Sequence, residues 1–347
     1  MDDRALDALQ VIVPNLHWRY SGVTATNRMI APLLGRLLPT AWLGRDVPGG
    51  VARLPLRDLL RLRFRRPRAA AIWHARRNNE MLAGVLLKAL GWPLALVFTS
   101  AAQRHHTWVT RFLIARMDGV IAASAAAASY LKRSASVIPH GIDTARFAPA
   151  PDRDAAYAAT GLPGKYAIGC FGRVRAQKGT DIFVEAMCRL LPKYPDFTAI
   201  VIGPVTFEQR AFAAALKERV SSAGLSERLR FLGELPAEEI PRWHQRLLIY
   251  AFTSRVEGYG LTLLEAMASG AALVATRAGA AEQVVREGET GLLVAPGDAD
   301  ALANAIEPLM RDPARAAEMG RAGRDRAAAE FAIDAEAEKI AAFYRQL

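Results

Sequence analysis

The sequence is poor in cysteine and lacks a long uninterrupted apolar run. Only Cys170 and Cys188 stand among its 347 residues. Two thiols cannot form a disulfide framework or a zinc site by themselves, so we expect a reducing compartment. The longest nearly apolar stretch, from Met81 to Phe98, is interrupted by a lysine, a glycine and a proline. It predicts a helix, a turn and a strand rather than a membrane span.

The first residues also lack the pattern of an export signal. The chain begins with Met1-Asp2-Asp3, which is acidic, and no long apolar segment follows it. Secretory signals begin with a basic segment followed by an apolar one. We therefore expect a protein that works in the cytoplasm.

Acidic residues are scarce in the first part of the chain. Residues 1–150 hold 21 Lys and Arg against 8 Asp and Glu, whereas residues 151–347 hold 24 against 26. The first part therefore carries a net charge of +13 and the second part −2. Such a basic body predicts an anionic partner, which could be nucleic acid, an anionic membrane surface or an acidic lipid.

Several common catalytic patterns are absent as well. The sequence has neither a cluster of His, Cys and carboxylates at metal-ligand spacing nor a Gly-x-Ser-x-Gly elbow. An Asp-x-Asp pair occurs at Asp298 and Asp300, directly after a Pro-Gly turn. That position is typical of a helix N-cap rather than of a metal site.

What the sequence does contain is a regular alternation of short apolar runs and helical patterns. Its length predicts two domains, and the alternation predicts parallel sheets covered by helices on both faces. Prolines and glycines between residues 144 and 164 interrupt the alternation and predict a linker. We therefore expect domains over 1–150 and 151–333, with a final helix over 334–347.

The most informative stretch runs from Ser254 to Gly270. It follows an apolar run, Leu247–Phe252, which predicts a buried strand, and it then opens a helix. Glu257 lies in the loop, and Glu265 follows eight positions later on the helix. Loop glycines let a ligand approach the backbone, and the free N–H groups of a helix start attract phosphate. A sugar nucleotide fits this combination of phosphate and hydroxyl sites.

A second loop supplies cations. In the segment Gly172–Gly179, Arg173 and Lys178 lie five positions apart, after a predicted strand and before a predicted helix. Two such cations can hold a diphosphate from two sides. Taken alone, the segment is more consistent with a solvated basic turn, since short motifs occur by chance. The Walker order of glycines, lysine and hydroxyl is absent.

Together, the two loops resemble those of the retaining glycosyltransferases of family four. The resemblance covers most of the chain and is strongest from Val137 to Val294, where three shorter motifs also match: 137–143, 231–235 and 287–294. It implies an α/β protein of the GT-B fold, with two Rossmann-like domains facing across a cleft. The first domain would bind the acceptor and the second the nucleotide sugar, and the last helix would cross back to the first domain.

The resemblance also implies roles for individual residues. Arg173 and Lys178 would hold the donor diphosphate, Glu257 would contact the transferred sugar, and Glu265 the ribose. The remaining donor contacts would come from backbone and loop positions, namely Gly22, Glu234, Leu235, Gly260, Leu261 and Thr262. The alternative for Glu265 is a helix carboxylate that only pairs with a neighbour.

The family also places a histidine after the strand that ends near Phe98. Here that position holds Thr99 or Ser100. His105 or His106 would replace it or cap a helix, and we predict His106 as the catalytic one. His74 ends the preceding strand and is a second candidate. Arg76 and Arg77 follow His74 closely in the chain. These three residues are predicted to bind the acceptor.

The segments around His74 and His106 are similar to those of lipopolysaccharide core mannosyltransferases. This implies transfer of a hexose, expected to be mannose from GDP-mannose, to a lipid-linked glycan acceptor, expected to be lipopolysaccharide core. No cofactor and no metal ion are expected, because protein cations would assist the leaving group. The alternatives are a UDP-sugar donor or a nucleotide-sugar epimerase of the same fold, and the identity of the base cannot be read from these residues.

A basic stretch, Leu56–Arg68, accounts for much of the positive charge with its six arginines. Leu56, Leu59, Leu60 and Phe64 are spaced for one helical face. This pattern predicts docking on an anionic membrane surface, here the inner face of the cytoplasmic membrane. The alternative is a surface helix that packs its apolar face on the core. Aromatic residues are few and no reading motif is present, so no nucleic acid partner is expected.

Overall fold

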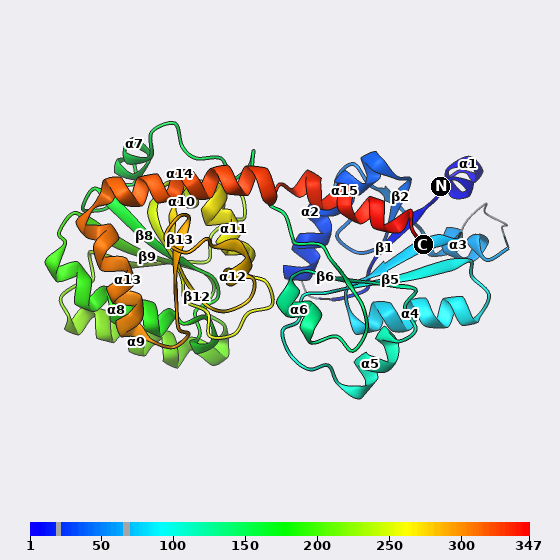
Figure 1. Ribbon diagram of the computed structural model, residues 1–347, viewed down its shortest axis with the longest axis horizontal. Helices are drawn as coiled ribbons and strands as arrows, with labels where there is room; N and C mark the ends of the chain where they lie inside the picture. Colours follow the sequence, from blue (N-terminus) through cyan, green and yellow to red (C-terminus); the bar gives the residue numbers. More distant parts are fainter. Residues whose placement is uncertain (19–21, 65–69) are drawn as a thin grey trace. The chain divides into compact units, whose positions relative to one another are not determined.

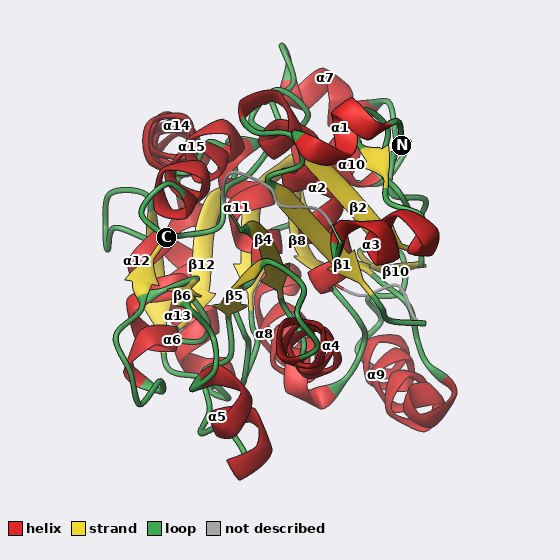
Figure 2. Cartoon of the chain, turned by 90° about the vertical axis from the view of Figure 1, so that its right-hand side faces the viewer, coloured by secondary structure: helices red, strands yellow, loops and turns green. Residues whose placement is uncertain are grey.

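The computed structural model describes residues 1–18, 22–64 and 70–347, and these form two compact units. The first unit comprises Met1–His140 and Ile333–Leu347, and the second comprises Gly141–Ala332. In each unit a sheet lies inside and helices lie outside it (Figures 1 and 2). The sheets confirm the predicted α/β class with two Rossmann-like halves.

The division lies at His140, so residues 141–150 belong to the second unit and not to the first, to which they were assigned. Hydrogen bonds explain this difference. Ser269 Oγ donates to the Phe147 carbonyl over 3.3 Å, and Gln245 Nε2 donates to the Ala148 carbonyl over 2.9 Å. Proline and glycine content indicates a break in the alternation, but it does not reveal which neighbour satisfies the backbone groups.

The first unit is built on a parallel sheet with the strand order β3-β2-β1-β4-β5-β6-β7. Its strands are β1 (Val11–Asn15), β2 (Thr40–Gly44), β3 (Ala52–Arg53), β4 (Ala71–Ala75), β5 (Leu94–Ser100), β6 (Gly119–Ala122) and β7 (Ser136–Val137). Its helices are α1 (Asp3–Asp7), α2 (Gly22–Leu37), α3 (Leu56–Leu62), α4 (Asn78–Ala89), α5 (Trp108–Ile114), α6 (Ala125–Ser129) and α15 (Ile333–Tyr344). Strands β2 and β3 were not predicted, because their apolar runs are too short to stand out.

Alternate residues of β1 supply two separate cores. Val11 and Val13 pack with α2 and α15 on one face of the sheet, and Ile12 packs with α3, α4 and α5 on the other. Period-two burial on both faces is typical of a parallel sheet covered by helices. The final helix, α15, thus packs on the first unit beside α2 (Figure 1).

The second unit is built on a parallel sheet with the strand order β10-β9-β8-β11-β12-β13. Its strands are β8 (Tyr166–Phe171), β9 (Phe197–Ile202), β10 (Leu229–Gly233), β11 (Leu247–Phe252), β12 (Ala272–Thr276) and β13 (Gly291–Val294). Its α-helices are α7 (Arg153–Ala158), α8 (Thr180–Leu190), α9 (Arg210–Ser222), α10 (Ile240–Gln245), α11 (Leu261–Ala268), α12 (Ala281–Val284), α13 (Ala299–Arg311) and α14 (Pro313–Glu330). Short 3-10 turns, η1 (Ala176–Lys178), η2 (Leu191–Lys193) and η3 (Phe207–Gln209), join some of these elements.

Each sheet has one point at which the strand order reverses. In the second unit, β8 and β11 are neighbours although two strands separate them in sequence. In the first unit, β1 and β4 are neighbours in the same way. The loops after such strands diverge to opposite faces and leave a crevice at the carboxyl edge, where ligands of open α/β sheets bind. In both units, the loops after these strands hold predicted site residues.

The basic stretch predicted to meet a membrane is partly described. Residues 65–69 lie outside the described part of the chain, and α3 covers the first half. Leu59 is buried at 6% exposure, whereas Leu56 and Phe64 are 71% and 82% exposed. The predicted single apolar face is therefore divided between core and solvent. Among residues 1–18, 22–64 and 70–347, no helix has the length and apolarity needed to cross a bilayer.

Candidate active site

The loop after β8, residues 172–179 and here called the basic loop, is held by one buried side chain and one glycine. Val174 is 2% exposed, and its N–H donates to the Pro204 carbonyl over 3.1 Å. Gly179 has φ of 68°, and a Cβ there would collide with the Thr253 carbonyl oxygen. Only glycine combines this backbone conformation with so close an approach. The contact brings the basic loop against the loop after β11.

The loop after β11, residues 253–260, is here called the acidic loop. Hydrogen bonds join it to the basic loop and to the first turn of α8. Thr253 Oγ1 donates to the Lys178 carbonyl over 2.9 Å. The Arg255 guanidinium binds both carboxylate oxygens of Asp181, over 2.8 and 2.7 Å. Gln177 Nε2 donates to the Val256 carbonyl over 3.2 Å. Bidentate pairs of this kind fix orientation as well as distance, so the two loops form one rigid surface.

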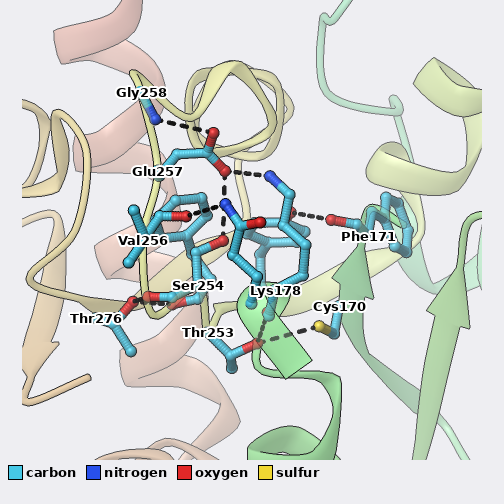
Figure 3. Close-up of polar contacts among 12 residues, drawn as sticks. Cys170, Phe171, Lys178, Thr253, Ser254, Val256, Glu257, Gly258 and Thr276 are labelled. Atoms are coloured by element: carbon cyan, nitrogen blue, oxygen red, sulfur yellow. Dashed lines mark hydrogen bonds and ion pairs between the residues drawn. The ribbon is translucent and has the colours of Figure 1, made fainter. Parts of the chain in front are cut away.

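On this surface, Lys178 Nζ donates to Glu257 Oε2 in a close ion pair (Figure 3). The lysine side chain is 23% exposed and the glutamate 18%. Ser254 Oγ also lies 3.4 Å from Glu257 Oε2, and the Gly258 N–H donates to Oε1 over 3.1 Å. Three donors therefore fix the orientation of the Glu257 carboxylate. The charged groups of Lys178 and Glu257 both remain partly exposed to solvent. The structure thus brings together the two residues that the sequence places 79 positions apart.

Helix α11 begins directly after the acidic loop. Its N-cap, Gly260, has φ of 95°, and a Cβ there would lie 2.8 Å from the Phe252 ring. The free N–H groups of the first turn, at Leu261 and Thr262, make this helix start a site for anions. Because the helix follows β11, its N-terminus lies at the same sheet edge as the basic loop.

Glu265 lies on the second turn of α11 and is 19% exposed. His244 of α10 lies behind it, fully buried, with Nε2 3.3 Å from Glu265 Oε2. The rings of Phe171, Tyr250 and Phe147 surround this imidazole at 4.6, 5.4 and 5.8 Å between centroids. These rings restrict rotation of the His244 imidazole, and the imidazole in turn orients the Glu265 carboxylate. Sequence reasoning missed His244, since nothing near it in the sequence signals a contact with α11.

Arg175 is a third cation of the basic loop that sequence reasoning did not single out. Its Nε is buried without a hydrogen-bond partner among the described residues. Burial, followed by repulsion from Arg173, lowers the pKa of Arg175, and the Glu257 carboxylate opposes this shift. Its guanidinium therefore adds to the positive potential around Glu257. Arg173 itself is exposed, and both arginines carry charge that an anionic ligand can neutralise.

Beneath the basic and acidic loops, the side chains near the ends of β8 and β11 are buried and uncharged. Cys170 Sγ lies 3.5 Å from Thr253 Oγ1, and burial raises the pKa of its thiol to about 11. Burial also holds the pKa of Tyr250 well above its ordinary value. Both side chains are therefore neutral at physiological pH and act as packing beneath the site. An ionised thiol is needed for nucleophilic attack, so Cys170 has no such role.

The predicted base-side residues follow β10, which lies farther along the same sheet. Glu234 is exposed and Leu235 is half-buried, after a left-handed Gly233 with φ of 75°. The Gly203 N–H donates to the Gly233 carbonyl over 2.8 Å, which joins this loop to the end of β9. Residues from the ends of β8, β10 and β11 thus share one edge of the second sheet.

In the first unit, the predicted residues lie at its own reversal point. Gly22 is exposed and begins α2, so it is not in the preceding loop. Arg77 follows β4 and is only 12% exposed. It binds Glu80 Oε1 over 2.8 Å, Asn15 Oδ1 over 3.0 Å and Thr24 Oγ1 over 2.7 Å. These contacts tie β4, β1 and α2 together, so Arg77 supports this edge of the sheet, and its role in acceptor binding stays a prediction.

His74 also has a structural role. It is 2% exposed, with Nδ1 2.5 Å from the Tyr344 hydroxyl and Nε2 2.6 Å from Thr99 Oγ1. Burial, followed by repulsion from Arg76, holds the pKa of His74 well below its ordinary value. The neutral, enclosed imidazole joins β4, β5 and α15, and its role in acceptor binding stays a prediction. Arg76 remains half-buried at the end of β4.

His106 lies in the segment between β5 and α5. Helix α5 begins at Trp108, and Thr107 is its N-cap, with Oγ1 accepting from the Thr110 N–H over 3.3 Å. Neither His105 nor His106 is therefore the cap. His106 Nε2 lies 3.4 Å from Ser100 Oγ, and burial lowers its pKa. Its catalytic role stays a prediction. Among the described ranges, no group of three or more His, Cys, Asp and Glu side chains could hold a metal ion.

Comparison with known proteins identifies the family. Residues 152–326 match the model "Glycosyl transferases group 1". The lipopolysaccharide core biosynthesis mannosyltransferase LpcC of Rhizobium leguminosarum bv. viciae is 49% identical over 98% of this chain and 97% of its own. LpsB of Rhizobium meliloti, described in the same words, is 47% identical over 98% of both chains. The chain belongs to the group 1 glycosyl transferases.

A solved structure agrees with the fold. Anabaena HepE, crystallised with UDP and glucose, superimposes with a TM-score of 0.83 over 98% of this chain and all of that one, at 20% identity. The predicted GT-B fold class is thereby confirmed. The matched residues 152–326 contain both the basic and the acidic loop. The predicted kinship with glycosyl transferases of the lipopolysaccharide core is thus supported by relatives along nearly the full chain.

Proposed function

We propose that this protein is a mannosyltransferase that moves mannose from GDP-mannose to a lipopolysaccharide core acceptor and retains the anomeric configuration. The observation that carries the proposal is the pairing of Lys178 with Glu257 at the reversal point of the second sheet. A cation for the diphosphate and a carboxylate for the sugar then lie side by side. The two relatives described as core mannosyltransferases support the choice of sugar and acceptor.

In this proposal, the basic loop and the start of α11 bind the donor diphosphate. Arg173, Lys178 and the first-turn N–H groups neutralise the charge that develops as the nucleoside diphosphate leaves. Glu257 accepts hydroxyl hydrogens of the mannose, and Glu265 accepts those of the ribose. The backbone around Glu234 and Leu235 lies by the base. Protein cations carry out this charge neutralisation, so the proposed reaction needs neither a metal ion nor another cofactor.

The stereochemical proposal is retention, as in family four, to which we assign the chain. The acceptor hydroxyl attacks the face that the diphosphate vacates, while Lys178 remains bound to the departing phosphate. His106 is the proposed group of the first unit that contacts the transferred sugar. Product from α-linked GDP-mannose should therefore be an α-mannoside, which proton–carbon coupling at the anomeric carbon distinguishes from a β-mannoside.

The acceptor is proposed to bind the basic first unit. Arg76, at the carboxyl edge of that sheet, offers it a cation. The expected acceptor is lipid-linked, so we further propose that the protein works in the cytoplasm, at the inner face of the cytoplasmic membrane. The exposed Leu56, Leu60 and Phe64 of the α3 segment, 71%, 57% and 82% exposed, are compatible with contact with such a surface.

Donor choice is tested most directly by thermal unfolding with GDP-, UDP- and ADP-sugars. We expect GDP-mannose to raise the unfolding temperature most, and stabilisation by UDP-sugars alone would disprove the mannose assignment. Transfer is then measured with GDP-mannose and a lipopolysaccharide core that lacks its mannose. Appearance of an epimerised sugar nucleotide without acceptor would instead identify an epimerase.

A further inference from the structure

A cavity of the second unit lies away from the basic and acidic loops. It has a volume of about 400 Å³, and it is bounded by residues 149–151, the end of α11 and one side of α14. Gln245, Ser269 and Gly270 of its lining precede β11 or β12. The basic and acidic loops follow β8 and β11, so the cavity lies at the opposite edge of this parallel sheet. The proposed function does not use it.

Close approaches of the backbone form the walls of this cavity. Gly320 of α14 meets the end of α11 so closely that a Cβ there would lie 2.1 Å from the Gly270 carbonyl oxygen. Pro149 lies 3.4 Å from the position that a Cβ on Gly270 would take. Figure 1 shows α14 running past α11. The elements around the cavity therefore pack on one another, which is typical of a site that is formed before its ligand binds.

The backbone acceptors near the cavity already have donors. The Arg324 guanidinium donates through Nη1 to the carbonyls of Thr144 and Ala268, over 2.8 and 3.1 Å. The Phe147 and Ala148 carbonyls accept from side chains, as described above. These bonds hold Arg324 in place and leave the other nitrogens of its guanidinium able to donate. The cavity therefore offers hydrogen-bond donors to a ligand rather than backbone acceptors.

Arg321 lies three positions before Arg324 on α14, so both side chains point to the cavity side of the helix. Arg321 is exposed, and within residues 1–18, 22–64 and 70–347 it has neither an ion pair nor a hydrogen bond. Arg153 adds a third guanidinium, 25% exposed, which shares the Asp154 carboxylate. Among the described residues that line the cavity, these three are basic and one, Asp325, is acidic. This excess of positive charge favours an anionic ligand.

The other groups of the lining suit a sugar. The planar arginine side chains match the paired oxygens of a phosphate. Asp325 can accept hydrogen bonds from sugar hydroxyls, and the Gln245 amide can accept or donate them. Pro149, Pro151 and Ala317 offer an apolar surface to the face of a sugar ring. A volume of about 400 Å³ lies in the range of sites for small molecules.

We propose that this cavity binds a phosphorylated monosaccharide, with its phosphate between Arg321 and Arg324 and its hydroxyls beside Asp325. The site is separate from that of the nucleotide sugar. It does not depend on the proposed function, because neither the basic and acidic loops nor the first unit contribute to its lining. A failure of mannosyl transfer would therefore leave this inference standing.

The test is isothermal titration of the full chain with mannose 6-phosphate. We expect the wild type to bind it, and Arg321→Glu should weaken binding at least tenfold. Arg315→Glu is the matched control, because Arg315 is exposed on the same helix outside the cavity lining and the change in charge is the same. No binding by the wild type, or equal losses in the two variants, would overturn the proposal.

A variant without a change in charge tests the cavity itself. Ala317→Trp should fill the space between α14 and residues 149–151, and it should reduce binding at least tenfold. Ala314→Trp, at an exposed position of the same helix, should change binding less than twofold. Circular dichroism and thermal unfolding establish that both variants are folded. Unchanged binding by a folded Ala317→Trp variant would place the ligand elsewhere and overturn the proposal.

The basic and acidic loops are the rival site for a sugar phosphate. Lys178→Ala should leave the affinity for mannose 6-phosphate within twofold of that of the wild type. A loss as large as that of Arg321→Glu would assign the ligand to the donor site instead, and it would overturn the proposal.

The class of ligand is tested with the two parts of the probe. At one concentration, mannose 6-phosphate should raise the unfolding temperature more than inorganic phosphate or mannose does alone, because only the ester reaches both the arginines and the apolar surface. Equal stabilisation by inorganic phosphate would indicate a simple anion site. Equal stabilisation by mannose would show that the arginines do not bind the phosphate. Either result would overturn the assignment to a phosphorylated sugar.

Discussion

The two reversal points of this protein use the same residue types in opposite ways. In the second unit, Lys178 and Glu257 pair while both remain partly exposed, at 23% and 18%. In the first unit, Arg77 pairs with a fully buried Glu80 and makes further bonds to two side chains. The Lys178–Glu257 pair is therefore accessible to a ligand, whereas the Arg77–Glu80 pair holds parts of its own unit together.

The difference teaches which ion pairs are candidates for chemistry. A buried pair with every donor satisfied cannot change partners without a large loss of solvation energy. A partly exposed pair loses little when a diphosphate takes over the lysine, because water and the ligand replace the lost contact. The pair at the second reversal point is therefore the better candidate for ligand exchange, and the pair at the first stabilises its unit. The expectations below test this contrast, from the largest effect to the smallest.

The largest effect is expected at the open pair. Lys178→Ala should lower kcat by about 10²- to 10³-fold, because the leaving diphosphate loses a preorganised cation. The measurement is GDP release from GDP-mannose in the presence of acceptor, with circular dichroism to verify folding. Lys165→Ala is the matched control, since Lys165 is 69% exposed and pairs only with Asp196 among the described contacts. Near-normal turnover of the Lys178 variant would refute the site.

The closed pair should respond in stability instead. Glu80→Ala leaves Arg77 buried without its carboxylate and removes the acceptor for the Arg76 N–H, which lies 2.8 Å away. Loss of one partner of a buried pair costs about 3 to 5 kcal/mol, so urea unfolding should show a large loss of stability. Asp196→Ala, which breaks an exposed pair, should cost less than about 1 kcal/mol. A small effect at Glu80 would contradict the contrast between the two crevices.

A moderate effect is expected behind Glu265. His244→Phe keeps the ring but removes the nitrogen that lies 3.3 Å from Glu265 Oε2. The freed carboxylate should raise KM for the donor about tenfold with a smaller change in kcat, since about 1.4 kcal/mol corresponds to a factor of ten. His244→Gln, which keeps a donor, should restore part of the affinity. An unchanged KM in both variants would show that His244 only fills space.

A smaller effect concerns stability against pH. The pKa of His74 is held well below 6.5 in the folded protein, because the buried imidazole cannot take a proton. The unfolded chain therefore binds more protons below about pH 6.5, and the free energy of unfolding should fall as pH drops through that range. Urea titrations of wild type and His74→Gln at pH 5 to 8 measure this. The variant should show a shallower fall, and parallel curves would contradict the assignment.

The smallest effect on mannosyl transfer is expected when a chelator removes metal ions. Arg173 and Lys178 are proposed to neutralise the diphosphate, so an excess of EDTA should leave mannosyl transfer within about twofold of its untreated rate. The assay uses protein dialysed against chelator, with Mg²⁺ added back as the comparison. A loss of activity that Mg²⁺ restores would show that a metal ion takes part in donor binding.

Much of the second unit could be predicted from local pattern. Its strands are continuous apolar runs, and β11 begins and ends with the apolar run Leu247–Phe252. The first unit was harder, because β2 and β3 are short. The burial of His74 and Arg77 was equally hidden from local pattern. Residue type suggests chemistry, but burial decides whether a ligand can reach it.

By itself, the sequence determined the alternation of strands and helices, the glycines of the two loops, and the residue types of the donor site. These follow from local rules of periodicity and backbone freedom, which act over a few residues. The tertiary structure alone decided which carboxylate meets Lys178, that His244 supports Glu265, and that Arg77 is enclosed. Those contacts join elements far apart in the chain, and they depend on the strand order of each sheet, which no local pattern encodes.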